Sequence, residues 1–148
     1  MNCNDVMTRN PACCVASESV SRAAQVMETE DVGSIPVVES TQSKKLIGIV
    51  TDRDLALRVV GGNRDPQNTR VEEVMTRNPV TCSPNDDLSL ALDYMSQHQV
   101  RRLPVVDANG QVVGIIAQAD VALRTDNDRK TAELVEEISR PELKVIRS

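Results

Sequence analysis

The sequence has almost no aromatic residues: among its 148 residues it contains neither Trp nor Phe, and Tyr94 is its single Tyr. The core must therefore be built from Val, Ile, Leu, Met and Ala side chains. A stacking platform for single-stranded nucleic acid needs several aromatic rings, so that class of binding site is nearly excluded. The net charge of -5 also argues against a general surface for polyanions, although a local basic pair could still bind one small phosphate.

The sequence also lacks any apolar run close to the roughly 20 residues that are needed to cross a membrane. Residues 1–5 carry neither the basic nor the apolar region of a signal peptide. The four cysteines form no C-x-x-C pair: Cys3, Cys13, Cys14 and Cys82. We therefore expect a cytoplasmic protein with no membrane partner, whose cysteines are reduced thiols.

One hexapeptide, V-M-T-R-N-P, occurs twice, at residues 6–11 and 74–79. After each copy, apolar residues recur at i, i+3, i+4 and i+7, which predicts a helix with one buried face. These residues are Val20, Ala23, Ala24 and Met27 in the first half and Leu88, Ala91, Leu92 and Met95 in the second. Ser17 and Asn85 are the expected N-caps of these two helices. The shared spacing supports a true internal repeat.

Each half then continues with the same order of elements. The apolar runs predict strands at 12–16, 35–39, 46–50, 103–107 and 112–116, and helices at 52–60 and 118–125. A unit of about 60 residues is too small to bury its own core well. The expected fold class is therefore α/β (α+β), with two β-α-β-β-α repeats packed through their sheets with pseudo-twofold symmetry.

The expected boundaries follow from the linker and the tail. Turn-forming residues fill 61–68, so the first repeat with its linker is assigned to 1–69 and the second repeat to 70–127. The tail, 128–148, is expected to hold one helix at 131–138 that could dock on the module or on a second subunit.

These segments together resemble a tandem pair of cystathionine-β-synthase (CBS) domains, also called a Bateman module. The matching pieces are the M-T-x-x-P part of each hexapeptide, I-P-V-V at 35–38, L-P-V-V at 103–106, and the strand-to-helix turns at 48–54 and 114–120. The resemblance covers about residues 6–127, and the order of segments is also similar to small bacterial stress- or hypoxia-associated CBS-pair proteins. It implies a stand-alone regulatory module and not an enzyme, since no nucleophile–base set is visible.

The resemblance implies a ligand and a place for it. CBS pairs commonly bind adenosine-containing ligands in two clefts, where an Asp of the strand-to-helix turn holds the ribose hydroxyls. A Ser or Thr of that turn faces the phosphate, and basic residues before the L-P-V strand of the opposite copy neutralise it. The adenine lies in an apolar slot, for which Ile49, Val80 and Thr81 are candidates. The expected ligands are AMP, ADP, ATP or NAD, and no cofactor is required.

Thr51 and Asp54 match the full turn motif and have two interpretations. In the first, the Thr51 hydroxyl donates to a phosphate oxygen and the Asp54 carboxylate accepts from two ribose hydroxyls. In the second, the same T-x-x-D spacing is a helix-capping box, which is the commoner role when the residues are considered alone. The resemblance makes ligand binding the better hypothesis, and capping is compatible with the empty state.

Arg101 and Arg102 precede the L-P-V-V strand, where a planar guanidinium suits a phosphate. The alternative is a pair of solvated surface arginines, the usual location of charged side chains. The first half has Gly33 and Ser34 at the corresponding place, so the two clefts cannot be equivalent. We expect the main phosphate site where the arginines meet the Thr51 turn.

The second cleft is expected to be weak, empty or suited to a nucleoside with less phosphate contact. Its turn has Ala117 where the first has Thr51, but it retains the carboxylate of Asp120. Asp120 could hold a ribose, and it is explained equally well by the favourable position of an acid at a helix N-terminus.

Two functions remain open from the sequence. The leading one is a non-enzymatic sensor that binds an adenine nucleotide, forms a homodimer and changes its self-association or its contact with an unidentified regulated protein. The alternative is a structural or redox- or metal-responsive module without nucleotide, which would use Cys14, Cys82 and His98. Thiols without a ligand role, together with a solvent-facing His98, are the more frequent outcome of such a set because ligand spacing is absent.

Overall fold

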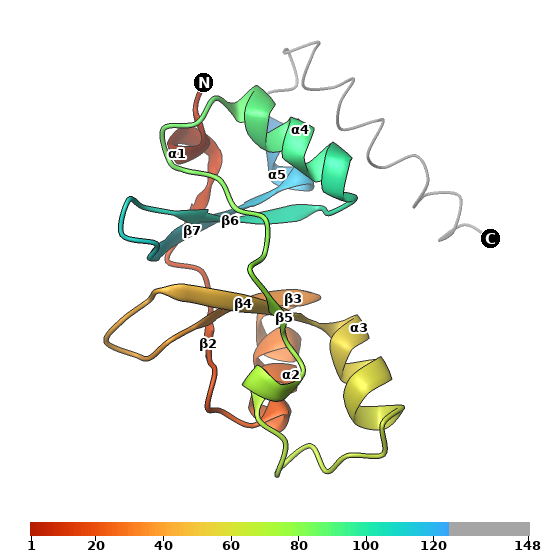
Figure 1. Cartoon of the computed structure of the whole chain (residues 1–148). Helices are drawn as coiled ribbons and strands as arrows, with labels where there is room; N and C mark the ends of the chain where they lie inside the picture. Colours follow the sequence, from red (N-terminus) through yellow and green to blue (C-terminus); the bar gives the residue numbers. More distant parts are fainter. Residues whose placement is uncertain (125–148) are drawn as a thin grey trace, which may run out of the picture. The chain divides into compact units, whose positions relative to one another are not determined.

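The computed structural model describes residues 1–124 and divides into two compact units (Figure 1). Unit A comprises Pro11–Pro79 and Asn109–Val112, and unit B comprises Met1–Asn10, Val80–Ala108 and the described residues from Val113 onward. Each unit combines one sheet with several helices, so the mixed α/β fold class is confirmed. The helix expected at 131–138 lies outside the described residues.

Unit A contains a four-stranded sheet in the order β2-β3-β4-β5. Its strands are β2 (Cys14–Val15), β3 (Ser34–Val38), β4 (Leu46–Thr51) and β5 (Thr76–Arg77). β2 runs parallel to β3, whereas β4 is antiparallel to both of its neighbours. Figure 1 shows the main helices on one face of this sheet: α2 (Val20–Glu30) and α3 (Asp52–Asp54), which continues into η1 (Leu55–Val60). A short 3-10 helix, η2 (Val71–Glu73), precedes β5.

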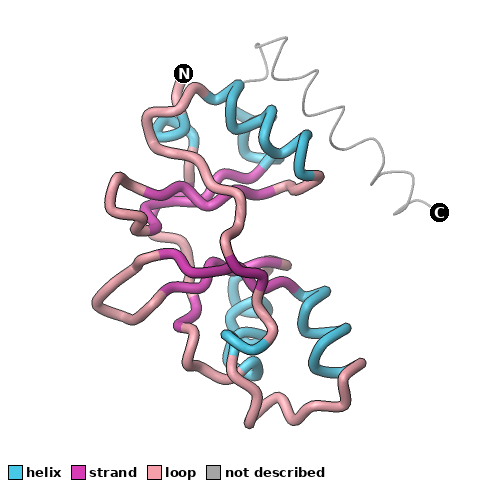
Figure 2. The backbone as a smooth tube through the Cα atoms, in the orientation of Figure 1, coloured by secondary structure: helices cyan, strands magenta, loops and turns pink. Residues whose placement is uncertain are grey.

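Unit B contains a three-stranded sheet in the order β1-β7-β6. Its strands are β1 (Thr8–Arg9), β6 (Arg102–Val106) and β7 (Val112–Ala117). The helices α1 (Cys3–Val6), α4 (Leu88–His98) and α5 (Gln118–Arg124) cover one face of this sheet, as the cyan and magenta segments of Figure 2 show. An isolated parallel bridge between Cys82 and Val105 stands where β2 pairs with β3 in unit A.

The helix starts differ from the sequence expectation by two residues in each repeat. Ser19 caps α2, because its Oγ accepts from Arg22 N–H at 3.2 Å, and Asp87 caps α4. The predictions of Ser17 and Asn85 as caps are therefore wrong. In the first repeat the chain makes one further turn before the helix begins, with Glu18 N–H donating to Val15 O at 3.0 Å. The helix expected at 52–60 is present, but η1 is a π-helix.

The two copies of the hexapeptide exchange partners. Thr8 of the first copy lies in β1 and pairs with Ile115 of β7, a strand of the second repeat. Thr76 of the second copy lies in β5 and pairs with Ile49 of β4, a strand of the first repeat. Each hexapeptide thus completes the sheet of the opposite repeat. The compact units consequently differ from the expected division after residue 69, because these pairings carry Met1–Asn10 into unit B.

Two glycines make room for the exchanged segments. A Cβ added at Gly48 would lie 2.6 Å from Met75 Sδ, and one added at Gly114 would lie 2.5 Å from Met7 Sδ. Both methionines are 5% exposed and fill matching places in the two cores. The methionine of the hexapeptide and the glycine of the strand opposite it therefore form one packing device that occurs twice.

Each unit has one core of aliphatic, Met and Cys side chains, as the lack of aromatic residues predicts. Seven of the eight helix positions that were expected to be buried are buried in the structure: Val20, Ala23, Met27, Leu88, Ala91, Leu92 and Met95. The prediction for Ala24 is wrong, because α2 buries a narrower stripe and leaves Ala24 exposed, while Val26 packs against the core. Across the described residues, no helix combines the length and the apolar character that spanning a bilayer requires.

Candidate functional site

The turn between β4 and α3 holds Thr51 and Asp54 in a reciprocal pair of hydrogen bonds. Thr51 N–H donates to Asp54 Oδ2 at 2.9 Å, and Asp54 N–H donates to Thr51 Oγ1 at 3.1 Å. The capping interpretation of the T-x-x-D spacing is thereby confirmed. The other carboxylate oxygen of Asp54, Oδ1, faces Arg58 Nε at 4.0 Å, and the Asp54 side chain is only 12% exposed.

The last residues of β4 place Thr51 beside an apolar neighbour. Side chains alternate between the two faces of a strand, so Ile49 and Thr51 share one face while Val50 points to the other. Val50 is buried in the core of unit A, whereas Ile49 and Thr51 are half-buried. Thr51 pairs with Ser34 of β3 across the sheet. This face therefore combines two hydroxyls, an apolar side chain and the nearby carboxylate of Asp54.

The corresponding turn of unit B joins Arg101 to the start of α5. Gln118 N–H donates to the Arg101 carbonyl at 2.9 Å, as the equivalent amide does in unit A. Arg101 is exposed and Arg102, the first residue of β6, is half-buried. Asp120 is half-buried in the first turn of α5. The structure thus brings the Arg101 backbone next to the turn that carries Asp120.

The predicted ligand-binding residues fall into two groups. Ile49, Thr51 and Asp54 belong to unit A. Unit B holds the others: Val80, Thr81, Arg101, Arg102 and Asp120. Val80 and Thr81 are half-buried, and Val80 packs against the core of unit B. The combination of the Thr51 turn with the two arginines joins different units and stays a prediction.

The residues of the alternative metal or redox site are not equally accessible. Cys14 is buried in the core of unit A and Cys82 in the core of unit B, while His98 is exposed in the last turn of α4. Burial raises the pKa of Cys14 to about 11, so its thiol is neutral at neutral pH. Within residues 1–124, no three His, Cys, Asp or Glu side chains are grouped so that they could hold a metal ion.

The structure also shows a thiol pair that the sequence reasoning missed. Cys3 and Cys82 are buried in the same core of unit B, where the Cys82 Sγ donates to the Pro104 carbonyl at 3.9 Å. The neighbouring Cys82 side chain lowers the pKa of Cys3 against the opposing effect of burial, and the Cys3 side chain together with burial raises the pKa of Cys82. No sequence spacing indicates this pair, because the long segment Pro11–Pro79 of unit A lies between its two members in the sequence.

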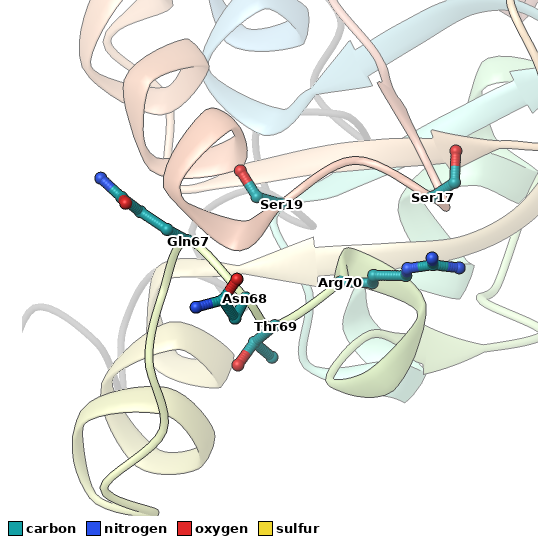
Figure 3. A pocket seen from close by; sticks show the side chains of 6 residues that line it. All are labelled: Ser17, Ser19, Gln67, Asn68, Thr69 and Arg70. Carbon is teal, nitrogen blue, oxygen red and sulfur yellow. The ribbon is translucent and has the colours of Figure 1, made fainter.

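A polar pocket of about 260 Å³ lies between the start of α2 and the linker. Figure 3 shows its lining: Ser17, Ser19, Gln67, Asn68, Thr69 and Arg70. Sequence reasoning treated this linker only as a turn. The first amide of α2 is already used, since Val20 N–H donates to the Thr69 carbonyl at 2.9 Å, and the Ser19 hydroxyl caps the helix. The pocket is open and polar, and the fold already uses the backbone amides of Gln67, Asn68 and Arg70, which donate to Asp65 or Glu73.

Comparison with known proteins identifies the repeat. The family model of the CBS domain matches the chain twice, at residues 3–61 and 71–124. The chain is 41% identical over 135 residues to the CBS domain-containing protein YhcV of Bacillus subtilis, a match that covers 91% of this chain and 93% of that protein. The two matches coincide with the two halves that the internal repeat predicts.

Solved structures agree with this assignment. Hypoxic Response Protein I with two coordinated zinc ions has a TM-score of 0.76 at 29% identity, with 83% of this chain and 98% of that chain covered. CBSX2 in complex with AMP has a TM-score of 0.73 at 27% identity, covering 85% and 96%. The CBS domain pair of MJ0100 with 5'-methylthioadenosine and S-adenosyl-L-methionine has a TM-score of 0.72 at 26% identity, covering 86% and 97%. The chain therefore belongs to the CBS domain family, as a tandem pair of CBS domains.

Proposed function

We propose that this CBS pair is a non-enzymatic sensor that binds an adenine nucleotide, namely AMP, ADP, ATP or NAD, through the Thr51–Asp54 turn. The observation that carries the proposal is the half-buried face at the end of β4, where a hydroxyl, a carboxylate and the apolar Ile49 lie together. A nucleoside phosphate needs these three kinds of group: an apolar surface for its base, acceptors for its ribose and donors for its phosphate.

The reciprocal capping bonds leave the needed capacity unused. The Thr51 hydroxyl accepts from Asp54 N–H, and its own O–H remains able to donate to a phosphate oxygen. The Asp54 carboxylate accepts one bond from Thr51 N–H, while an ionised carboxylate has about four acceptor positions. It can therefore accept from the two ribose hydroxyls without giving up its cap. Ile49, with Val80 and Thr81, would form the adenine slot.

Arg101 and Arg102 are proposed to neutralise the phosphate that the Thr51 hydroxyl contacts. Guanidinium groups bind phosphate oxygens through two parallel hydrogen bonds and stay charged at every physiological pH. This preference favours nucleotides over S-adenosylmethionine, which carries no phosphate. The cleft around Asp120 is proposed to be the weaker one, because Ala117 supplies no hydroxyl there.

The relatives support this ligand class. The AMP complex of CBSX2 and the adenosine-derivative complex of MJ0100 concern CBS pairs that cover most of this chain. We further propose that the chain acts in the cytoplasm as a homodimer and transmits ligand binding to a regulated protein, without a cofactor. The zinc ions of Hypoxic Response Protein I make zinc the competing ligand that an experiment has to distinguish.

Thermal unfolding with AMP, ADP, ATP, NAD and ZnCl2 tests the proposal. A nucleotide at 100 times its Kd should stabilise the protein by about 2.7 kcal/mol. Arg102→Ala should remove most of that shift, whereas Arg77→Ala, which changes an exposed arginine of β5, should retain it. A shift that Arg102→Ala leaves intact would refute the phosphate role of Arg102. Stabilisation by zinc alone, with zinc found in the purified protein, would favour the metal-responsive alternative.

A further inference from the structure

We propose that Arg58 transmits occupancy of the Thr51–Asp54 turn to the second copy of the hexapeptide, residues 74–79, because its guanidinium group reaches both places. This role rests on the proposed function for its ligand and deepens it, since a sensor needs a route by which its site alters the rest of the fold. All residues of this route belong to unit A. The link between Asp54 and the hexapeptide can therefore be measured in the protein without nucleotide.

Arg58 reaches two acceptors through two different nitrogens. Its Nη1 donates to the Val74 carbonyl at 3.0 Å, and its Nε lies 4.0 Å from Asp54 Oδ1. Arg58 and Val74 are 16 positions apart in the chain, so this bond attaches the helix that follows the candidate site to a distant segment. Because a guanidinium group is planar and rigid, a displacement of either acceptor is passed to the other.

The Asp54 carboxylate is placed to respond to a ligand. Its side chain is 12% exposed and its Oδ2 already accepts from Thr51 N–H, while Arg58 faces the remaining oxygen. A nucleotide over the turn would exclude water, and the attraction between opposite charges increases as the surrounding dielectric constant falls. We therefore expect nucleotide binding to draw Arg58 closer to Asp54 and to hold the Val74 carbonyl more firmly.

Val74 stands at the start of the segment that completes the sheet of unit A. It is fully buried, and the next two residues are Met75, which packs against Gly48, and Thr76, which pairs with β4. β5 has only two residues, and a strand this short is held by few ladder hydrogen bonds, so its local stability depends on its anchors. The Val74 carbonyl is such an anchor, and a change in its bond to Arg58 should alter how often β5 opens.

The backbone around Arg58 is irregular in a way that favours a functional role. Arg58 lies inside η1, where Gly61 N–H donates to the Ala56 carbonyl at 2.8 Å with the spacing of a π-helix. Such helices are rare and occur frequently at functional sites. The Arg58 side chain is 53% exposed, so the strength of its pairing with Asp54 still depends on solvent access and can increase when a ligand covers the turn.

Hydrogen exchange of the full chain, followed by mass spectrometry, tests the link without a ligand. The amides of residues 74–77 are compared in the wild type, Asp54→Asn, Arg58→Gln and the double variant. Asp54→Asn should speed their exchange at least about 2-fold, because Arg58 loses the charge that orients it. In the Arg58→Gln background, the same change at Asp54 should add nothing. An Arg58 that only supports the fold would instead give independent, additive effects.

Two further variants control for charge and for folding. Arg53→Gln removes a positive charge from an exposed arginine of the same turn, and the exchange of residues 74–77 should match the wild type. Arg58→Lys keeps the charge but replaces the planar fork with one ammonium group, so the coupling to Asp54 should be lost in it as well. Arg58→Lys takes the place of Arg58→Gln if circular dichroism shows that the glutamine variant does not fold.

The same measurement with AMP, ADP, ATP or NAD, each at saturating concentration, connects the link to the ligand. In the wild type and in Arg53→Gln, the nucleotide that binds should slow exchange both at residues 49–55 and at residues 74–77. In Arg58→Gln it should slow exchange at residues 49–55 only.

The outcomes separate this role from the proposed function. Equal effects of Asp54→Asn with and without Arg58 would overturn the proposal, and so would nucleotide protection of residues 74–77 that Arg58→Gln retains. A wild type that no nucleotide protects at residues 49–55 would refute the proposed function instead. The comparison without ligand would still decide the role of Arg58 in that case.

Discussion

Thr51 and Asp54 each use the other as a hydrogen-bond partner, with the two amides donating in opposite directions at 2.9 and 3.1 Å. The pair fixes the turn between β4 and α3 through bonds within the chain itself. A nucleotide would therefore find the hydroxyl and the carboxylate already in place, and little ordering would be required on binding. Capping and ligand binding are compatible roles of the same two side chains.

Replacement of Thr51 measures how much its capping hydroxyl contributes to the stability of the fold. Thr51→Ala removes the acceptor of Asp54 N–H and should lower the free energy of unfolding by about 1 kcal/mol. Thr51→Ser retains the hydroxyl and should stay close to the wild type. Urea denaturation followed by circular dichroism measures both values. Equal losses in the two variants would show that the hydroxyl does not stabilise the turn.

A comparison of two carboxylates tests which turn binds the ribose. Asp54→Asn keeps an oxygen that can accept from Thr51 N–H but removes the charge, so the fold should persist while nucleotide affinity drops at least about 10-fold. Asp120→Asn should change the affinity of the main site by less than about 2-fold. Isothermal titration with the nucleotide that stabilises the wild type best gives both affinities. If the two effects are reversed, the main site belongs to the Asp120 turn.

The glycine–methionine device makes a prediction about stability. Gly48→Ala would place a methyl group 2.6 Å from Met75 Sδ and 2.8 Å from the Thr76 carbonyl, a backbone atom that cannot move away without disturbing β5. We expect a loss of about 1 to 3 kcal/mol in the free energy of unfolding. Gly33→Ala is the matched control, because its Cβ would meet only the Asp52 carboxylate at 3.1 Å. A loss in Gly33→Ala as large as in Gly48→Ala would contradict this explanation.

The raised pKa of Cys14 predicts a loss of stability in alkaline solution. Burial raises this pKa to about 11, above the ordinary value of 9.0, so the folded state keeps its proton where the unfolded state releases it. Stability from the neutral thiol is therefore fully present below about pH 9 and decreases as the pH rises to about 11. The full effect is about 2 to 3 kcal/mol. Urea denaturation between pH 8 and pH 11 should show a shallower decline for Cys14→Ala than for the wild type.

Much of the fold could be predicted because local sequence patterns determine most of its helices and strands. The doubled hexapeptide and the matching helix spacing identify the repeat, and the β-branched runs locate β3, β4, β6 and β7 within one or two residues. The exchange of the hexapeptides could not be predicted, since Thr8 and Thr76 have the same neighbours in sequence and nothing local selects their partner strands. The predicted N-cap residues were wrong for a similar reason: several polar residues precede each helix, and the sequence does not select one of them.

The candidate site was only partly predictable. The T-x-x-D spacing identifies Thr51 and Asp54 as neighbours, since both of their roles need the same turn. The burial of Cys3 and Cys82 in one core depends on the exchanged segment, which brings α1 to the second repeat, so spacing arguments could not predict it. The polar pocket at Arg70 is formed by a linker that has no regular pattern at all.

Because each hexapeptide pairs with a strand of the opposite repeat, neither repeat can complete its sheet alone. A polypeptide that ended before residue 74 would lack β5 and leave the outer edge of β4 without its hydrogen-bonding partner. Bare sheet edges recruit another strand, and the nearest suitable one is the identical hexapeptide of a second copy. A chain with one repeat could cover that edge by reciprocal strand donation between two copies. The tandem repeat makes the same exchange within a single chain, so neither sheet depends on a second molecule for its edge strand.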